Sequence, residues 1–409
     1  MKPSAANDSA SDNRLAMSAE GTMAAEATAA PPAPGTAAPP AGPRDPGVPS
    51  PEDALTTVQK AAAGPPLKGR KSGYIIGPMT DSIALIYSPL IALAIGIFIS
   101  QARVMHEEVS FMGHRDSPVS MFIGTFIMAH LFLVFFRSHG NKQIFQLHPM
   151  RFTLVPIALF AAMMSSVWVA VTVSVIATWW DVYHSSMQTF GIGRIYDMKA
   201  GNKPMTGRRL DHMLNLLLYT GPILAGASLM AHIEDFDEYE AVGSVFFTSI
   251  PAYTMDRQSV LTWILLLVGV PFLLYYLYYY WRLSKAGTYK VPYQKVALLV
   301  STGFCSIYTW GFNTFGEAFF IMNFFHALQY FALVWSIEKK NMQSTFGFGK
   351  VKLNKTVTMV IFLAVGFSYG WWAESSDGSS DVTFSLIMVV SIMHFWYDGF
   401  IWSVRKKQL

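Results

Sequence analysis

Long apolar runs constrain the fold of this chain more than any other feature of its sequence. The run TWILLLVGVPFLLYYLYYYW at 262–281 is one of several without a charged residue over about twenty positions, the length that an α-helix needs to cross the hydrocarbon core of a bilayer. The chain is 52% hydrophobic and 14% charged, which is too apolar for an ordinary soluble protein of this size. We therefore expect an all-α, polytopic membrane helical bundle.

Ten membrane-spanning helices account for the apolar runs. The stretch 152–192 is too long for one crossing, and we divide it at the small pair Ser165–Ser166 into two helices. The other expected spans lie near residues 80–100, 119–136, 210–231, 260–281, 296–312, 317–337, 356–373 and 382–403.

The distribution of Lys and Arg predicts the orientation of these spans, because basic residues are retained on the cytoplasmic side. With the N-terminus inside, the expected inner loops and the C-terminal RKKQL hold twenty Lys and Arg residues, and the outer loops hold three. The alternation holds at every loop only if 152–192 is two helices. The sequence therefore predicts that both termini are cytoplasmic, and we expect an integral protein of a bacterial inner membrane.

The first 75 residues differ in composition from the rest of the chain. They are rich in Ala, Pro, Gly and Ser and contain no apolar run long enough for a signal-peptide core. We expect residues 1–75 to be a disordered Ala/Pro-rich cytoplasmic tail and residues 76–409 to form the transmembrane helical domain. The single cysteine, Cys305, excludes an intrachain disulfide and a cysteine-rich metal site.

Histidines within the spans are the candidate functional residues, since ionisable side chains in membrane helices are costly and mark function by default. Four of them lie on separate spans, in the half of the membrane that we expect to be cytoplasmic, and we predict that they bind metal. These candidate ligands are His130, His184, His326 and His394.

Each predicted ligand on the later spans has polar neighbours on the same helix face, because residues three, four or seven apart share a face. Asp181, His184 and Gln188 are spaced i, i+3 and i+7 in the segment WWDVYHSSMQTFG. These spacings allow an acid or amide to orient a metal-bound imidazole or to supply a further ligand. The expected auxiliary residues are Asp181, Gln188, Asn323, Gln329, Tyr330, Asp398, His139 and His212.

The residue types indicate which metal chemistry is expected. Imidazole with occasional carboxylate and no thiolate suits iron, zinc or copper better than calcium or magnesium. A non-haem iron site that is open to dioxygen would use several neutral imidazoles, and a bundle of apolar helices would admit a hydrophobic substrate directly from the bilayer. We therefore expect an oxygenase of a lipid, carotenoid or other isoprenoid, with one or two irons.

Two late segments, FFHALQYFALVW at 324–335 and MHFWYDGFIWSVR at 393–405, resemble the C-terminal histidine motifs of the Brp/Blh family. Members of this family are membrane proteins that cleave β-carotene with dioxygen at a histidine-held iron. His326, Phe331, Val334 and Trp335 match the first motif, and His394, Asp398, Phe400, Ile401 and Arg405 match the second. Tyr330 stands where the family has a second histidine. The resemblance implies a helical bundle with an interior iron site, in which His184 and His130 take the place of earlier family histidines.

Other readings of the same residues remain open. A single intramembrane histidine often makes an interhelical hydrogen bond, and two histidines on different helices are also the axial ligands of b-type haem. A transporter would use intramembrane His and Asp as a proton relay. The expected partners are a hydrophobic substrate, membrane lipid and a cytosolic electron donor; no nucleic acid is expected.

Overall fold

The computed structural model describes residues 73–102, 107–225, 258–312, 315–347, 354–376 and 380–402. By its internal contacts the chain divides into the units Met1–Lys68 and Gly69–Leu409, and all described residues belong to the second unit. The tail expected at residues 1–75 lies almost entirely outside the described residues.

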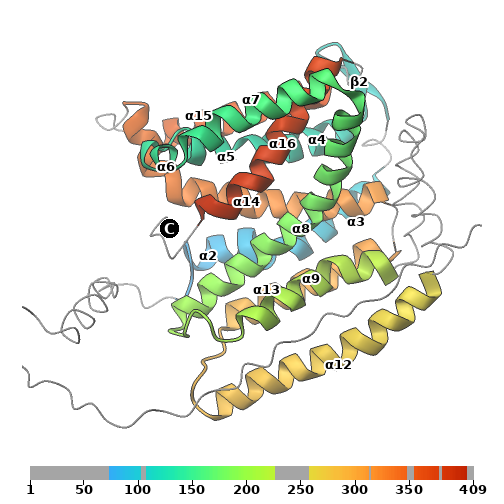
Figure 1. The fold of residues 1–409 in the computed structure, drawn as a ribbon, viewed down its shortest axis with the longest axis vertical. Helices are drawn as coiled ribbons and strands as arrows, with labels where there is room; N and C mark the ends of the chain where they lie inside the picture. The colour runs from blue at the N-terminus through green and yellow to red at the C-terminus, as the bar shows by residue number, and fades with distance from the viewer. Residues whose placement is uncertain are drawn as a thin grey trace, which may run out of the picture. The chain divides into compact units, whose positions relative to one another are not determined.

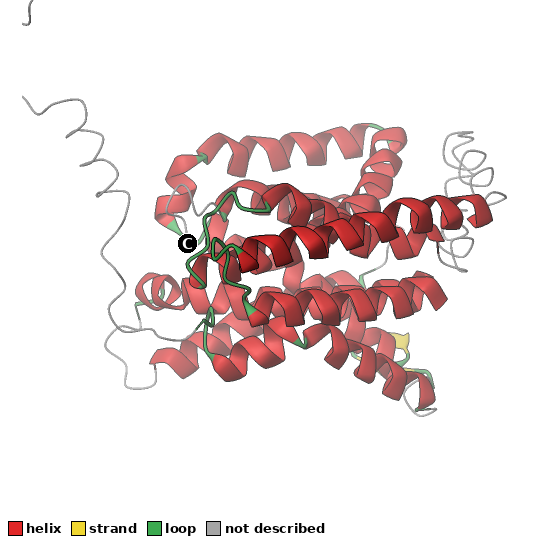
Figure 2. Cartoon of the chain, turned by 90° about the horizontal axis from the view of Figure 1, so that it is seen from below, coloured by secondary structure: helices red, strands yellow, loops and turns green. Residues whose placement is uncertain are grey.

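Helices dominate the described residues, as expected for an all-α protein (Figure 2). A two-stranded antiparallel hairpin pairs Val109 with Asp116 and Phe111 with His114. The elements in chain order are α2 (Pro78–Thr80), the π-helix η1 (Asp81–Ile86), α3 (Ser88–Gln101), β1 (Val109–Phe111), β2 (His114–Asp116), α4 (Pro118–Phe132), α5 (Val134–Ser138), α6 (Lys142–Leu147), α7 (Pro149–Ser165), α8 (Val167–Lys199), α9 (Arg208–Ala225), α12 (Gln258–Lys285), α13 (Tyr293–Phe312), α14 (Phe315–Thr345), α15 (Asn354–Ser375) and α16 (Asp381–Ile401).

The helix boundary expected at Ser165–Ser166 is confirmed. Helix α7 ends at Ser165 and α8 begins at Val167, because Ser166 takes an extended conformation with φ −156° and ψ 120°. The single helix expected at 80–100 is wrong in detail. The π-helix η1 and α3 are separated at Tyr87, and the segments Pro78–Ile86 and Ser88–Ile99 meet at an angle of 58°. Ser88 and Pro89 open the second segment, and proline at a first turn favours a new helix start.

Helices lie at all ten expected positions, but not all of them meet the requirements for a span. Five described helical segments are long and apolar enough to cross a membrane, and the bent pair at 78–99 would be a sixth. The five are Pro118–Ser138, Ser259–Lys285, Ala318–Thr345, Asn354–Ser375 and Asp381–Ile401. These lengths and compositions are those of an integral membrane protein.

The packing of the helices separates an interior group from an outer one (Figure 1). Helix α14 packs against α3, α4, α13 and α15, and α16 packs against α4, α7 and α8. Helix α12 packs mainly on α9 and exposes large apolar side chains such as Trp263, Leu267 and Leu274. Exposed apolar side chains along a span are expected where a helix faces lipid.

Two glycines on α15 allow this helix to pack closely on α4. A Cβ atom at Gly370 would lie 2.1 Å from the Thr125 carbonyl oxygen and 2.8 Å from the Ala129 nitrogen. A Cβ at Gly366 would lie 3.1 Å from the Leu133 side chain. Small residues at such positions let the backbones of membrane helices approach each other.

Substitution Gly370→Ala should therefore push α15 away from α4. We expect a loss of about 1–3 kcal/mol in the free energy of unfolding, the range measured for overpacked cores. The measurement is unfolding in mixed detergent micelles. Gly399→Ala is the matched control, because a Cβ at this helical position meets no atom within 4 Å. Equal stability of the two variants would contradict close packing at Gly370.

Candidate metal centre

Four helices each bring one histidine to the same place in the interior. His130 comes from the last turn of α4, His184 from the middle of α8, His326 from α14 and His394 from α16. All four side chains are buried, with exposed fractions of 1%, 6%, 0% and 0%. The structure thus brings together all four residues that the sequence predicts as ligands.

The ring separations can be compared with those around a single metal ion. The ring centroids of His130 and His326, His130 and His394, His184 and His326, and His184 and His394 are 5.1, 5.0, 5.0 and 4.8 Å apart. His326 and His394 are 6.3 Å apart. With a metal–nitrogen bond of about 2.1 Å, neighbouring rings lie about 4.6–5.3 Å apart, and opposite rings of a square-planar site lie about 6.5 Å apart. These five separations fit imidazoles around one ion, and the ligand atoms form two overlapping groups: His130, His326 and His394, and His184, His394 and Asp398.

Imidazole nitrogens point into this cluster without hydrogen-bond partners. Nδ1 of His130 bonds the Ile127 carbonyl of its own helix, which leaves Nε2 without a protein partner. Nε2 of His184 and both ring nitrogens of His326 also lack partners. The ligand atoms of His130, His326 and His394 lie within 4.8 Å of one another. Buried imidazoles that are unpaired and converge in this way are a donor set for a metal ion.

Asp398 places a carboxylate next to these rings. Its Oδ1 accepts hydrogen bonds from the Tyr330 hydroxyl at 2.9 Å and from Nε1 of Trp402 at 2.8 Å. Its Oδ2 lies 3.7 Å from Nε2 of His184. A second possible ligand group therefore comprises His184, His394 and Asp398. Tyr330 also lines the cluster, since its ring centroid is 4.6 Å from that of His394.

A buried ion pair that the sequence analysis did not identify anchors the end of α16 beside this carboxylate. Arg137 pairs with Glu338 of α14, and its Nε and Nη2 donate to the Ile401 carbonyl at 3.2 and 2.9 Å. The Arg137 guanidinium also lies 4.2 Å from the centre of the Trp402 ring. Arginine thus satisfies backbone at the end of α16 and fixes the indole that bonds Asp398. The sequence signal for this ion pair was an arginine and a glutamate, each at the inner end of an expected span.

Comparison with family models, curated proteins and solved structures finds no match for this chain. The residues themselves therefore carry the functional argument.

Two of the other predicted residues lie next to the cluster. Asp181 is one helical turn before His184, is buried, and hydrogen-bonds Asn323. Its Oδ1 has no hydrogen-bond partner. Asn323 is in turn one helical turn before His326 on α14. Both residues are thus placed to support a ligand rather than to replace one.

The two predicted glutamines connect helices instead of facing the rings. Nε2 of Gln188 donates to the His326 carbonyl at 3.1 Å and to Oε1 of Gln329 at 2.9 Å. Nε2 of Gln329 donates to the Leu85 carbonyl at 3.0 Å. Their contribution is to hold α8, α14 and η1 in register around His326.

The structure does not bring His139 and His212 to the cluster. Nε2 of His139 donates to the Phe152 carbonyl at 3.1 Å, and its Nδ1 lies 2.9 Å from the Ser138 hydroxyl. Burial lowers the pKa of His139, which lies just beyond the span. His212 packs on Phe190, with ring centroids 5.5 Å apart. Both have local packing roles because helix spacing alone does not determine which face of the bundle a residue joins.

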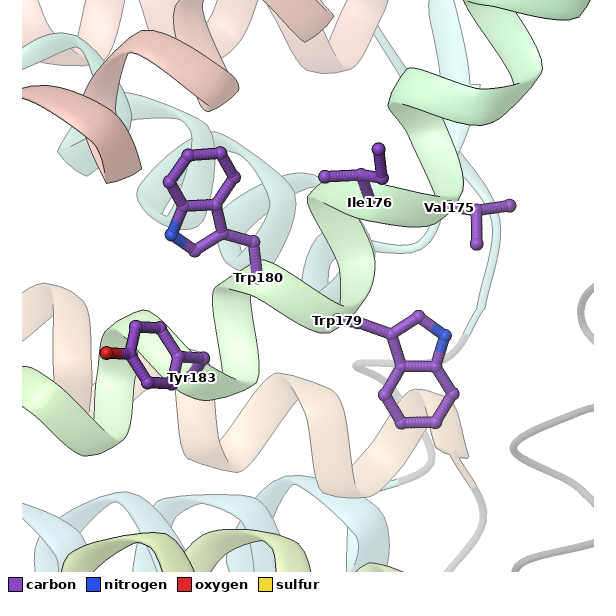
Figure 3. A pocket seen from close by; sticks show the side chains of 5 residues that line it. All are labelled: Val175, Ile176, Trp179, Trp180 and Tyr183. Carbon is purple, nitrogen blue, oxygen red and sulfur yellow. The ribbon is translucent and has the colours of Figure 1, made fainter. Parts of the chain in front are cut away.

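An apolar surface groove of about 470 Å³ lies on α8 close to the cluster. Its lining residues are Val175, Ile176, Trp179, Trp180 and Tyr183 (Figure 3). Trp180 packs on Phe395. The ring centroids of Phe395 and His184 are 5.1 Å apart. A single aromatic layer thus separates this apolar surface from the histidines.

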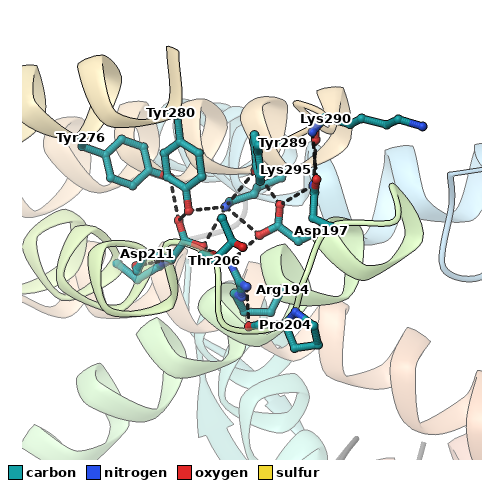
Figure 4. A network of polar contacts seen from close by, with 12 residues as sticks. Arg194, Asp197, Pro204, Thr206, Asp211, Tyr276, Tyr280, Tyr289, Lys290 and Lys295 are labelled. Atoms are coloured by element: carbon teal, nitrogen blue, oxygen red, sulfur yellow. Dashed lines mark hydrogen bonds and ion pairs between the residues drawn. The ribbon is translucent and has the colours of Figure 1, made fainter. Parts of the chain in front are cut away.

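A second buried polar group joins α8, α9 and α13, and the sequence analysis missed it (Figure 4). Nζ of Lys295 lies 2.8 Å from both Asp197 and Asp211. Arg194 bonds the same two carboxylates, at 2.6 and 2.5 Å. The hydroxyls of Tyr276 and Tyr280 donate to Asp211, and that of Tyr289 donates to Asp197. Two cations and two anions balance, which is the condition for burying charge.

Proposed function

We propose that this chain is a membrane-embedded metalloprotein that holds one iron ion through His130, His184, His326 and His394 and oxidises a hydrophobic substrate with dioxygen. The observation that carries the proposal is the convergence of four buried imidazoles from four helices, at the ring spacing of a single metal site. The donor set contains neither thiolate nor more than one nearby carboxylate, which favours iron, copper or zinc over a hard cation.

Each group around the site has a defined task in this proposal. The imidazoles hold the ion, which when bound would supply redox chemistry with dioxygen. Asp398 lies beside Nε2 of His184 as a further possible ligand, and it is itself held by Tyr330 and Trp402. The apolar helices exclude water, and the surface beside Trp180 would let an apolar substrate approach from the bilayer.

The resemblance to the Brp/Blh family supports a carotenoid or other isoprenoid as the substrate class. His326, His394 and Asp398, which carry that resemblance, are among the residues at the cluster. Tyr330, which replaces a histidine of the family motif, lines the same cluster through His394. Within this proposal the ligand lost at Tyr330 is replaced by a histidine from another helix.

The same proposal includes the topology inferred from charge: ten spans, with both termini on the cytoplasmic side of a bacterial inner membrane. It is supported by helices at all ten expected positions and by the asymmetry of Lys and Arg. A cytosolic electron donor would then approach the basic inner loops.

The packing of the four rings favours a non-haem site over the haem alternative. A bis-histidine haem places a flat macrocycle between its two axial imidazoles. The separation of His326 and His394 would suit axial ligands, but His130 and His184 lie about 5 Å from both of them and occupy the space of the macrocycle. An absorption spectrum of the purified protein should therefore lack a Soret band.

The catalytic part of the proposal is tested with iron-loaded protein, a carotenoid and isoprenoid panel, and ¹⁸O-labelled dioxygen. We expect ¹⁸O in the product and no incorporation with a variant that does not retain iron. Iron retention without oxygen incorporation into any member of the panel would reject the oxygenase while leaving the metal site intact.

Asp398→Asn should weaken metal binding without removing a histidine. The amide cannot provide the negative charge beside Nε2 of His184, and loss of a carboxylate that supports a metal site costs about 10–100-fold in metal affinity. The measurement is the dissociation constant from a competition titration with a chelator. Asp381→Asn, at the exposed first turn of the same helix, is the control. An unchanged affinity in Asp398→Asn would remove Asp398 from the site.

A further inference from the structure

A continuous stripe of buried polar side chains follows the interface of α8, α9 and α13. We call it the polar seam. On α9 and α13 its members recur at three-, four- or seven-residue spacings, which keeps them on one face, and on α8 the adjacent pair Ser185 and Ser186 and the more distant Asp197 complete the series. The three helices pack against one another in pairs. The members are Asp181, Ser185, Ser186, Thr189 and Asp197 on α8, Asp211, Asn215 and Tyr219 on α9, and Lys295, Thr302, Ser306 and Thr309 on α13.

Direct contacts join the three helices along the seam. The hydroxyls of Thr189 and Tyr219 lie 2.8 Å apart, and the Ser306 hydroxyl donates to the Leu218 carbonyl at 2.5 Å. One end of the seam is the charged group around Lys295 (Figure 4). The other end is Asp181, one turn from His184.

Four polar atoms within the seam have no hydrogen-bond partner. They are Asn215 Oδ1, Thr302 Oγ1, Ser186 Oγ and Asp181 Oδ1. Their side chains are 1%, 0%, 0% and 6% exposed, so bulk solvent does not satisfy them. Other seam hydroxyls are satisfied: Thr309, for example, donates to the Cys305 carbonyl at 2.7 Å.

The cost of leaving these four atoms without hydrogen bonds indicates which kind of ligand would bind beside them. A buried polar group without a partner loses the hydrogen bonds that it makes to water in the unfolded chain, and lipid offers no replacement partner. Four such atoms along one stripe would therefore destabilise a dry interface. Bound water satisfies this kind of group, typically with about three hydrogen bonds per molecule.

We propose that the polar seam binds a file of water molecules that connects the Lys295 group with Asp181. Water in this position gives protons a route from the end of the helices that carries the charged group to the acid beside the histidine cluster. A redox site enclosed by apolar helices needs such a route, but the water file itself does not depend on bound metal.

Hydroxyl-radical footprinting of the purified full-length chain tests the proposal, because X-ray radiolysis of bound water modifies the side chains that touch it. Tyr219 is 1% exposed and belongs to the seam, whereas Tyr196 is 0% exposed and donates its hydroxyl to Asp81. We expect Tyr219 to be modified at least fivefold faster than Tyr196. Equal rates for these two buried tyrosines would show a dry seam and overturn the proposal.

Two variants test whether the labelling of Tyr219 depends on the hydroxyls that have no hydrogen-bond partner. The double variant Ser186→Ala/Thr302→Val removes two of them and should lower the Tyr219 rate to that of Tyr196. Thr309→Val makes the same chemical change at a satisfied hydroxyl of α13 and should leave the Tyr219 rate unchanged. A low Tyr196 rate in every variant would confirm that the fold is retained. Undiminished Tyr219 labelling in the folded double variant would mean that the label comes from another path, which contradicts the proposed water file.

Discussion

His326→Ala should reduce bound iron from about one ion per chain to less than about a tenth of that value. His326 is fully buried, and neither of its ring nitrogens has a hydrogen-bond partner. Removal of a direct ligand should exceed the 10–100-fold effect of losing a group that only orients a ligand. The measurement is elemental analysis of detergent-purified protein, with iron added during expression.

The control for this prediction is a histidine of the same chain outside the cluster. His212→Ala changes a residue that packs on Phe190, and it should retain the wild-type metal content. Full iron in His326→Ala would reject the four-histidine site. Absence of metal from wild type, variant and control after mild purification would instead return these histidines to hydrogen bonding or proton transfer and favour the transporter alternative.

Lys295→Met should destabilise the fold by about 3–5 kcal/mol, the cost of removing one partner from a buried ion pair. Lys295 is 3% exposed and lies between Asp197 and Asp211. Methionine fills a similar volume but, among the described residues, leaves the two buried carboxylates with Arg194 as their remaining ion-pair partner. The free energy of unfolding in mixed micelles measures the effect.

Two further variants make the prediction specific to charge. Lys290→Met alters an exposed side chain of the same segment and should change stability by less than about 0.5 kcal/mol. Adding Asp197→Asn to Lys295→Met restores the charge balance with Arg194 and Asp211 and should recover part of the loss. A double variant that is less stable than Lys295→Met alone would contradict electrostatic compensation in this group.

The sequence was sufficient to predict the helices because their signals are local. Apolar runs placed a helix at every expected position, and the break at Ser165–Ser166 was confirmed. The bend at Tyr87 was not expected, because a run of apolar residues does not distinguish one straight helix from two. The number of spans and their orientation remain predictions, since five described segments meet the requirement for a span and the bent pair is a possible sixth.

The clustered histidines were also accessible from sequence, for an energetic reason. A histidine in an apolar helix needs a partner, so His130, His184, His326 and His394 were informative individually. Gln188 and Gln329 show the limit of this reasoning, because their helix spacing was read correctly but they bond each other and backbone carbonyls.

The charged group at Lys295 was not predicted at all. The expected span at 296–312 left Lys295 in the basic loop that precedes it. In the structure it is the third residue of α13, and it meets carboxylates that are 98 and 84 positions away in the chain. Their pairing could not be read from local spacing, since each charge taken alone fits a loop or a helix end.

The sequence by itself determined that this is a helical membrane protein and which residues are too polar to lie in lipid without a partner. These properties follow from the transfer free energy of each side chain, which depends on residue type and on position along a helix. Only the tertiary structure decided which polar residues lie together: four histidines in one buried cluster, and a charged group at one end of the polar seam. Which residues come into contact depends on the rotation and packing of helices that are distant in sequence. The free energies that stabilise one arrangement over another come from the contacts between helices.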